Sequence, residues 1–377
     1  MGNFYVVSAV YLPTGAATNR CLAFLRGFDE QNIKTKSVFL MPDAKRSKVD
    51  DSKFNNMDFI YLCDRFGTTN KYFKYLFGCI NAIRLRRMLK PGDKVFLTGA
   101  IYTSLFTSKS GVEVYHERTE HPDAVHNYTS FLDFNNYRYL KTCRKMSGIF
   151  VISTALKYYF INYGVSPKKV HVINMIVDMN RFKDITKQEN VEKYIAYCGT
   201  ASNNKDGVDQ LLTAFSIVAK SHPDVKLYII GNAPTRAEGF SNIELVEKLG
   251  IKDRVVFTGL VKSEEMPQLL KNAQVLALDR PDSLQARNGF PTKLGEYLMT
   301  ANPVVVTKVG DIPLFLKDGE TALLADERNP EDFASKLSWA LDNPKEAGEI
   351  GVKGQKVAIS SFNYLLESKK IIEIIED

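Results

Sequence analysis

A turn from strand to helix lies at residues 280–298, where the sequence reads RPDSLQARNGFPTKLGEYL. The apolar run Val275–Leu278 before it predicts a buried strand, and Thr292–Met299 after it has helical periodicity. Pro291 suits a first helical turn, because a free N–H is not needed there. Backbone N–H groups at such a helix start can hold a diphosphate, and the Glu296 carboxylate can accept hydrogen bonds from a ribose diol.

The same alternation of strands and helices runs through the chain in two series. The second series restarts at the predicted strand Tyr194–Cys198, after the polar run 183–190. Repeated βα units predict parallel sheets that are covered on both faces. We therefore expect an α/β protein with two Rossmann-like doubly wound domains that face each other across a cleft. The expected boundaries are 1–182 and 183–356, with a C-terminal helix in 357–377 that packs back on the first domain.

Composition agrees with a globular protein of about two domains. The chain has 377 residues, of which 45% are hydrophobic and 25% charged. No apolar run approaches the about 18 residues of a membrane span, and the first residues lack the pattern of a signal peptide. The five cysteines are odd in number, and no two have metal-ligand spacing. These features predict a cytoplasmic protein with reduced thiols and no metal site.

Charge is distributed unevenly between the two halves. Residues 1–183 hold 27 Lys and Arg against 14 Asp and Glu, whereas the remainder holds 23 against 29. The first half is thus expected to face an anionic partner. No helix-turn-helix, zinc-finger or RNA-binding pattern accompanies the charge, so nucleic acid is not expected.

One basic segment, residues 71–90, also carries large apolar side chains at helical spacing. These are Tyr72, Phe73, Leu76, Ile80 and Ile83. The segment is compatible with a helix on an anionic membrane surface, and equally with a helix that packs on the core and exposes a basic face.

Two more turns after predicted strands contain glycine. Gly15 and Ala16 follow the first strand, and Gly199 precedes Lys205 and the second series' first helix. Each turn can be a phosphate cradle or a simple tight turn. Neither is a P-loop or a dinucleotide fingerprint, because the required Gly-Lys-Ser/Thr or GxGxxG is missing.

A predicted strand at 112–115 is followed by His116, Glu117 and Arg118. A histidine at the carboxyl end of a strand can serve a ligand site, although a structural role is as compatible with the sequence. Zinc binding by His116 and His121 would lack a third ligand.

Taken together, residues 289–310 and the segments DRVVFTG (253–259) and DGETALL (318–324) resemble glycosyltransferases of family 4. The resemblance implies the GT-B fold and a retaining transfer of sugar from a nucleotide donor to a hydroxyl, with no metal and no cofactor. The nucleotide sugar, UDP- or GDP-linked, is a substrate. The first domain would bind the acceptor and the second the donor.

Residue by residue, the resemblance implies a catalytic set of His116, Lys205 and Glu296. Lys205 would hold the diphosphate, Glu296 the ribose, and the backbone near Phe257 the base. The implied donor-binding residues are Gly15, Ala16, Gly199, Thr200, Lys205, Phe257, Gly259, Arg287, Asn288, Gly289, Phe290, Thr292 and Glu296.

Three positions depart from the family pattern. Asn288 replaces a glutamate, Thr200 replaces an arginine, and Met175-Ile176 replaces Asn-Gly. The first two leave open a non-catalytic subunit that only binds a sugar nucleotide.

The resemblance and the basic first half also imply an acceptor. A glycan on a lipid diphosphate, at the inner face of the plasma membrane, would place the protein in bacterial capsule, O-antigen or exopolysaccharide assembly. A soluble metabolite or a protein hydroxyl remains an alternative acceptor.

Overall fold

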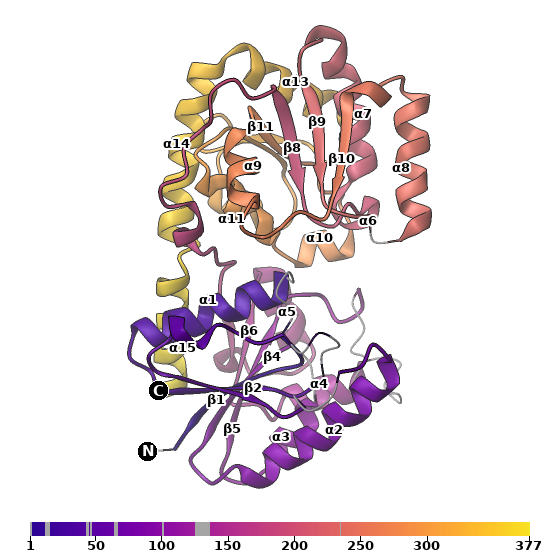
Figure 1. The fold of residues 1–377 in the computed structure, drawn as a ribbon. Helices are drawn as coiled ribbons and strands as arrows, with labels where there is room; N and C mark the ends of the chain where they lie inside the picture. The colour runs from indigo at the N-terminus through magenta and orange to yellow at the C-terminus, as the bar shows by residue number, and fades with distance from the viewer. Residues whose placement is uncertain are drawn as a thin grey trace. The chain divides into compact units, whose positions relative to one another are not determined.

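The computed structural model describes residues 2–11, 16–42, 45, 47–63, 67–99, 102–124, 136–233 and 235–377, with the backbone alone at 16, 17 and 71. The chain divides into two units, Met1–Ile176 with Tyr364–Asp377, and Val177–Asn363. Each unit contains one wholly parallel sheet with helices on its faces (Figure 1), which confirms the expected α/β class with two doubly wound domains.

Unit 1 is built on a seven-stranded sheet with the order β3-β2-β1-β4-β5-β6-β7. Its strands are β1 (Phe4–Ser8), β2 (Thr35–Phe39), β3 (Met57–Tyr61), β4 (Lys94–Thr98), β5 (Glu113–Arg118), β6 (Gly148–Val151) and β7 (Val170–Val172). Its helices are α1 (Ala16–Glu30), α2 (Lys71–Met88), α3 (Thr103–Thr107), α4 (Tyr137–Cys143), α5 (Thr154–Asn162) and α15 (Tyr364–Glu376).

Unit 2 repeats this arrangement with six strands in the order β10-β9-β8-β11-β12-β13. The strands are β8 (Tyr194–Cys198), β9 (Lys226–Ile230), β10 (Val255–Gly259), β11 (Val275–Leu278), β12 (Val304–Thr307) and β13 (Leu323–Ala325). The helices are α6 (Asn203–Asp206), α7 (Val208–Ser221), α8 (Arg236–Lys248), α9 (Met266–Asn272), α10 (Leu284–Asn288), α11 (Thr292–Met299), α12 (Ile312–Phe315), α13 (Pro330–Asp342) and α14 (Pro344–Ser361).

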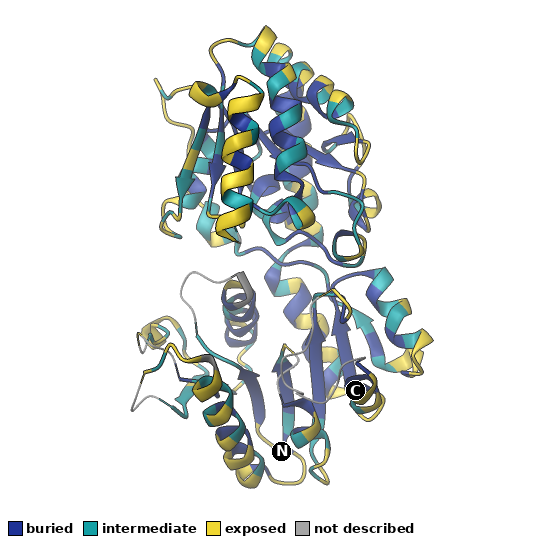
Figure 2. Cartoon of the chain, turned by 90° about the vertical axis from the view of Figure 1, so that its right-hand side faces the viewer, coloured by how far each residue is buried: buried dark blue, intermediate teal, exposed yellow. Residues whose placement is uncertain are grey.

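The central strands are apolar because helices cover both faces of each sheet. Every residue of β8, β11 and β12 is buried, as expected for parallel strands between two helical layers. In unit 1 the core beneath α1 is aromatic, and the Phe24 ring meets the Phe96 ring edge to face at 6.1 Å. Figure 2 shows the resulting buried strands and the exposed outer faces of the helices.

The last helix, α15, belongs to unit 1 and packs on α1. Tyr364 Oη donates to Glu30 Oε1 at 2.7 Å, and the buried Glu367 accepts from the Asn174 backbone N–H at 2.8 Å. The units divide after residue 176 and after residue 363, whereas the sequence placed these boundaries after 182 and 356.

The difference at the C-terminal boundary has a physical cause in α14, a helix that the sequence pattern did not predict. This helix belongs to unit 2 and packs on α11. Glycines are poor helix formers, so the sequence pattern of this segment does not indicate a helix. Glycine at position 351 permits the packing near α11, because a Cβ there would collide with the Ala301 carbonyl oxygen.

Helix α2 resolves the two alternatives for residues 71–90 in part. Asn70 caps it by accepting from the N–H groups of residues 72 and 73. Its core-facing side is made of Asn81, Ala82 and Leu85. The exposed side carries all five large apolar residues named above, with Tyr72 74% and Phe73 53% exposed. The proposed core-packing role is therefore wrong for those five side chains.

Among the described residues, no helix has the length and apolar character needed to cross a membrane. All five cysteines are free, and Cys21, Cys143 and Cys198 are buried.

Candidate functional site

The strand order of unit 2 reverses between β8 and β11, which are neighbours in the sheet. After these two strands the chain continues on opposite sides of the sheet, which leaves a crevice between the carboxyl ends of the strands. In open α/β sheets, ligands usually bind in such a crevice. The turn Gly199–Ser202 follows β8, and residues 279–283 follow β11. The first of these turns contains Gly199 and Thr200, which were expected to bind the donor.

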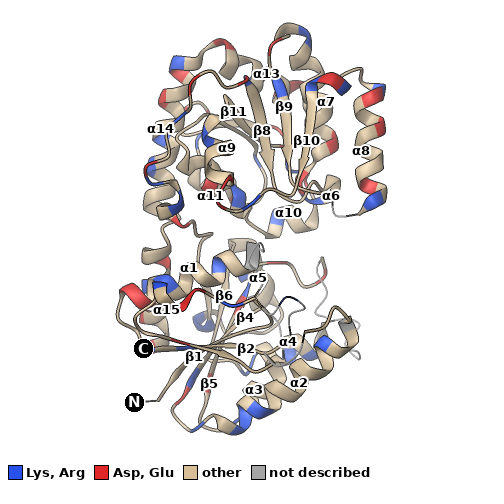
Figure 3. Ribbon diagram, viewed as in Figure 1, with Lys and Arg blue, Asp and Glu red and all other residues tan. Residues whose placement is uncertain are grey.

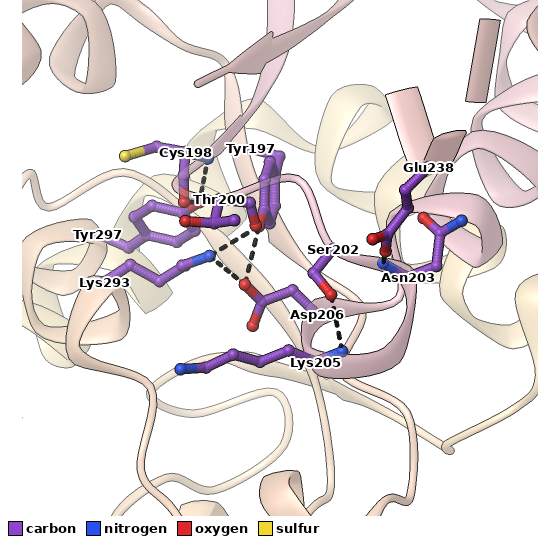
Figure 4. Close-up of polar contacts among 10 residues, drawn as sticks. All are labelled: Tyr197, Cys198, Thr200, Ser202, Asn203, Lys205, Asp206, Glu238, Lys293 and Tyr297. Carbon is purple, nitrogen blue, oxygen red and sulfur yellow. Dashed lines mark hydrogen bonds and ion pairs between the residues drawn. The ribbon is translucent and has the colours of Figure 1, made fainter. Parts of the chain in front are cut away.

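A buried ion pair lies at this position. Lys293 Nζ of α11 is 2.6 Å from Asp206 Oδ2 at the end of α6 and donates to Tyr197 Oη at 2.8 Å. Tyr197 Oη lies 2.8 Å from the same carboxylate and 2.6 Å from the Thr200 carbonyl oxygen. Figure 4 shows the three side chains converging beside the β8 turn. Burial alone would raise the pKa of Asp206, but Lys293 and Arg280 outweigh it and hold that pKa below its usual value.

The turn between α6 and α7 is seated directly on the end of β11. Gly207 has a φ of +61°, and a Cβ there would collide with the Asp279 carbonyl oxygen. The Asp279 side chain is buried, and its Oδ2 has no hydrogen-bond partner among the described residues. Burial, with a smaller contribution from Asp209, raises the pKa of Asp279 to about 7.

Lys205 lies in the same short helix as Asp206. Ser202 caps the helix, with its Oγ accepting from the Lys205 N–H at 3.3 Å. The Lys205 side chain is half-buried, and in Figure 4 it runs alongside the Asp206–Lys293 pair. The predicted phosphate-binding lysine thus lies at the switch point, next to a second lysine that the sequence analysis did not single out.

Glu296 of α11 is engaged by a partner that the sequence analysis missed. Its Oε1 forms an ion pair with Arg181 Nη1, and Arg181 Nη2 donates to the Ser263 carbonyl oxygen at 3.0 Å. Both charged side chains are about one fifth exposed, at 22% and 23%. Residues 181 and 296 are distant in sequence, and no local pattern connects them.

The segment between α10 and α11 contains the other predicted donor residues. Arg287 is exposed and pairs with Asp282 at 3.2 Å, while Asn288 Nδ2 donates back to the Leu284 carbonyl oxygen at 2.9 Å. Gly289 is buried at the end of α10, and Thr292 begins α11. The Phe290 ring is buried against Phe315 and Phe362, so this side chain packs in the core.

A pocket of about 290 Å³ opens at the carboxyl ends of β8, β9 and β10. Its lining is Ala201, Gly231, Asn232, Ala233, Gly239, Asn242, Ile243, Phe257 and Gly259. The Phe257 ring is 39% exposed. Ala201 belongs to the turn whose Gly199 contacts the Lys293 side chain, so one short turn connects the pocket to the charged network.

The other predicted site residues belong to unit 1. His116 is inside β5, which continues to Arg118, so the expectation that the strand ends before His116 is wrong. Its ring is fully buried, and Nε2 lies 2.7 Å from Tyr139 Oη. Burial, helped by Arg118, lowers the pKa of His116 to about 3. The ring is therefore neutral at ordinary pH, and a catalytic role for it stays a prediction.

The remaining unit 1 residues are structural or outside the description. Glu117 forms a buried ion pair with Arg20 of α1 at 2.7 Å. Ala16 begins α1, and Gly15 lies outside the described residues. No group of three or more His, Cys, Asp or Glu is placed to hold a metal within the part of the chain that the structure describes.

Comparison with known proteins confirms the resemblance. Residues 192–343 match the family model of Glycosyl transferases group 1. Mannosylfructose-phosphate synthase of Agrobacterium fabrum is 25% identical over 229 residues, which are 57% of this chain and 49% of that protein. The MMP alpha-(1->4)-mannosyltransferase of Mycolicibacterium hassiacum is 24% identical over 242 residues, or 63% and 55%. The matches thus span about half the length of these relatives.

Solved structures share the fold over their whole length. Anabaena Alr3699/HepE in complex with UDP and glucose has a TM-score of 0.74, 15% identity and full coverage of both chains. A mutant of S. aureus TarM with UDP bound has a TM-score of 0.76 and 13% identity, again with full coverage.

Proposed function

We propose that the chain is a glycosyltransferase that moves a sugar from a nucleoside diphosphate sugar to a hydroxyl acceptor, and that unit 2 binds the donor. One observation carries this proposal: the pocket beyond β8–β10 and the lysines at the switch point share the turn 199–202. A base in the pocket and a diphosphate at the lysines would fit the two ends of one nucleotide. The similarity to two mannose-handling relatives, and to structures with UDP bound, supports the same conclusion.

Within this proposal each charged residue of unit 2 has a defined task. Lys205 is assigned to the diphosphate, with the N–H groups at the start of α11, and Lys293, which pairs with Asp206, lies beside it. Glu296 accepts from the ribose hydroxyls with the carboxylate that Arg181 holds in place. The backbone of residues 257–259 and the Phe257 ring frame the base. Arg287, Asn288 and Thr292 remain proposed contacts to the donor sugar and phosphates.

We propose a retaining transfer that requires no metal. The bond from the sugar C1 to the diphosphate oxygen breaks, and a bond from C1 to the acceptor oxygen forms on the same face. The acceptor's proton passes to the departing diphosphate. Positioning and stabilisation of the developing negative charge supply the catalysis. His116, if it contacts the sugar, acts as a neutral hydrogen-bonding group and carries no positive charge at neutral pH, in keeping with its lowered pKa.

The acceptor is assigned to unit 1, and we propose a lipid-linked glycan of bacterial surface-polysaccharide assembly. Helix α2 exposes Tyr72, Phe73 and Leu76 together with Arg84 and Arg87. Figure 3 marks in blue the Lys and Arg positions along α2. Exposed aromatics beside arginines suit the interface of an anionic membrane at the inner face of the plasma membrane. A soluble metabolite or protein acceptor would leave this surface without a task.

The test is a panel of UDP- and GDP-linked sugars, with binding measured by calorimetry and hydrolysis followed by nucleotide release. We expect one donor to bind at micromolar concentration and to be hydrolysed slowly. Binding of a donor with neither hydrolysis nor transfer to any offered glycan would instead favour the non-catalytic subunit. The amide of Asn288, which is turned back on its own helix, is the observation that keeps that alternative open. Failure of every donor to bind would refute both.

A further inference from the structure

The pocket of unit 2 contains a buried polar group that no contact among the described residues explains. Asn242 of α8 lines it and is 1% exposed. Neither its Oδ1 nor its Nδ2 has a hydrogen-bond partner among the described residues. Because both polar atoms lack a partner, the finding is the same whichever of the two amide positions is assigned as oxygen and which as nitrogen. Burying such a group without partners costs about 1–3 kcal/mol per atom.

A second buried asparagine shows what a structural amide looks like in this unit. Asn302 Nδ2 lies 2.9 Å from the carbonyl oxygens of Leu270 and Lys271 and 3.0 Å from that of Ala273. That amide ties three backbone groups together. Asn242 does nothing comparable, so folding alone gives no reason for an amide at this position.

The surroundings of Asn242 indicate the kind of ligand that would satisfy it. The other lining residues are mainly glycine and alanine, with Ile243 and the half-exposed Phe257 ring as the large apolar groups. A volume of about 290 Å³ is at the low end of ligand pockets and suits one flat ring system. The α8 side of the pocket is held by Glu238, which accepts from the Asn203 N–H at 2.5 Å.

We propose that Asn242 reads the nucleobase of the donor by a pair of hydrogen bonds to its Watson–Crick edge. This inference rests on the proposed function, because it needs the base to enter this pocket. A carboxamide has a donor and an acceptor side by side, as does the edge of uracil or guanine at its ring N–H and carbonyl. The pair would complete the hydrogen bonding of the amide and of the base together.

The experiment compares Asn242→Leu with the structural control Asn302→Leu and the surface control Glu244→Gln on the exposed face of α8. Binding of UDP, GDP, ADP and pyrophosphate is measured by calorimetry, and thermal unfolding by circular dichroism. For Asn242→Leu we expect binding of the preferred nucleotide to weaken at least about tenfold, with pyrophosphate unaffected and no loss of melting temperature. Asn302→Leu should lower the melting temperature, and Glu244→Gln should change nothing.

A modified ligand isolates the contact from the general shape of the pocket. The preferred nucleotide is compared with its analogue methylated on the ring nitrogen, N3 of uracil or N1 of guanine. The wild-type protein should reject the analogue, whereas Asn242→Leu should bind both about equally, since the two changes remove one interaction.

Each other outcome would overturn the inference. If Asn242→Leu binds the nucleotide as the wild type does, or still rejects the methylated analogue, Asn242 does not read the base, while the proposed function stands. If Asn242→Leu loses stability as Asn302→Leu does, the amide is structural. If the wild type binds none of the three nucleotides, the inference fails together with the proposed function.

Discussion

The two units share one strand order around their switch points, yet they place charge differently. At the ends of β8 and β11 in unit 2, Lys293 and Asp206 are buried together. At the equivalent ends of β1 and β4 in unit 1, Ser8 Oγ lies 2.6 Å from Thr98 Oγ1, and Glu117, the neighbour of Thr98 on β5, is buried in an ion pair with Arg20 of α1. Unit 1 also exposes basic side chains on α2, among them Arg84 and Arg87. Both units thus bury an ion pair near these strand ends, but the pair joins α1 to β5 in unit 1 and α6 to α11 in unit 2. The side chains at the strand ends define a site, and the fold does not.

The largest effect should follow loss of the cation that we assign to the diphosphate. Lys205→Ala is expected to lower kcat/KM for the donor about 100- to 1,000-fold, since the developing charge on the leaving group loses a fixed partner. Steady-state kinetics measure this effect, with Lys220→Ala on the exposed end of α7 as the control. If the two variants were equally active, the assignment of the diphosphate to Lys205 of α6 would be wrong.

Loss of the ribose partner should have a smaller effect. Glu296→Ala is expected to raise the donor KM about 10- to 100-fold, the equivalent of a hydrogen bond to a charged group. The wild type should prefer the donor over its 2′-deoxy analogue, and the variant should lose this preference. Unchanged donor affinity in Glu296→Ala would contradict the assignment and leave the Arg181–Glu296 pair with a structural role only.

The proposed membrane binding by the exposed basic residues of α2 can be tested with lipid vesicles. Removal of two exposed cations, in the double variant Arg84→Ala, Arg87→Ala, should weaken binding to vesicles with anionic lipid about tenfold or more, at about 1 kcal/mol per basic residue. Co-sedimentation at low and high salt measures it, and salt should release the wild type. Donor hydrolysis should be unchanged in the variant. If the wild type does not bind the vesicles, the membrane proposal is wrong and a soluble acceptor is favoured.

The last prediction concerns stability instead of activity or binding, through its pH dependence in unit 2. The pKa of Asp279 is about 7 in the folded protein, raised from a usual value of 3.8. Between these values the folded state binds the extra proton, so this group lowers stability as the pH rises, by at most about 1.4 kcal/mol per pH unit. Asp279→Asn should remove that decline, and its advantage over the wild type should grow from pH 4 to pH 7 and then level off. Denaturant unfolding of both proteins at several pH values checks this, and parallel curves would show that the carboxyl is ionised without penalty.

Local patterns predicted the elements on which the site is built. The helix Thr292–Met299 and the strands Val275–Leu278 and Tyr194–Cys198 lie where the sequence placed them. Apolar periodicity and turn residues act over a few positions, so a single sequence is enough to find such elements. Helix α14 was missed because glycines are poor helix formers. Two of its glycines, Gly351 and Gly354, are explained by close packing on α11 and the residues near it.

By itself the sequence determined two βα series, the turns after their strands and the resemblance to family 4 glycosyltransferases. Only the tertiary structure decided the partners of the charged and polar side chains. Lys293 meets Asp206 and Arg181 meets Glu296 across 87 and 115 positions of the chain, and His116 is buried inside a strand instead of ending one. The sequence could not identify Asn242 as a candidate, because whether an amide lacks hydrogen-bond partners depends on the residues that surround it in the fold. Pairing and burial depend on contacts between distant segments, and no local pattern encodes those contacts.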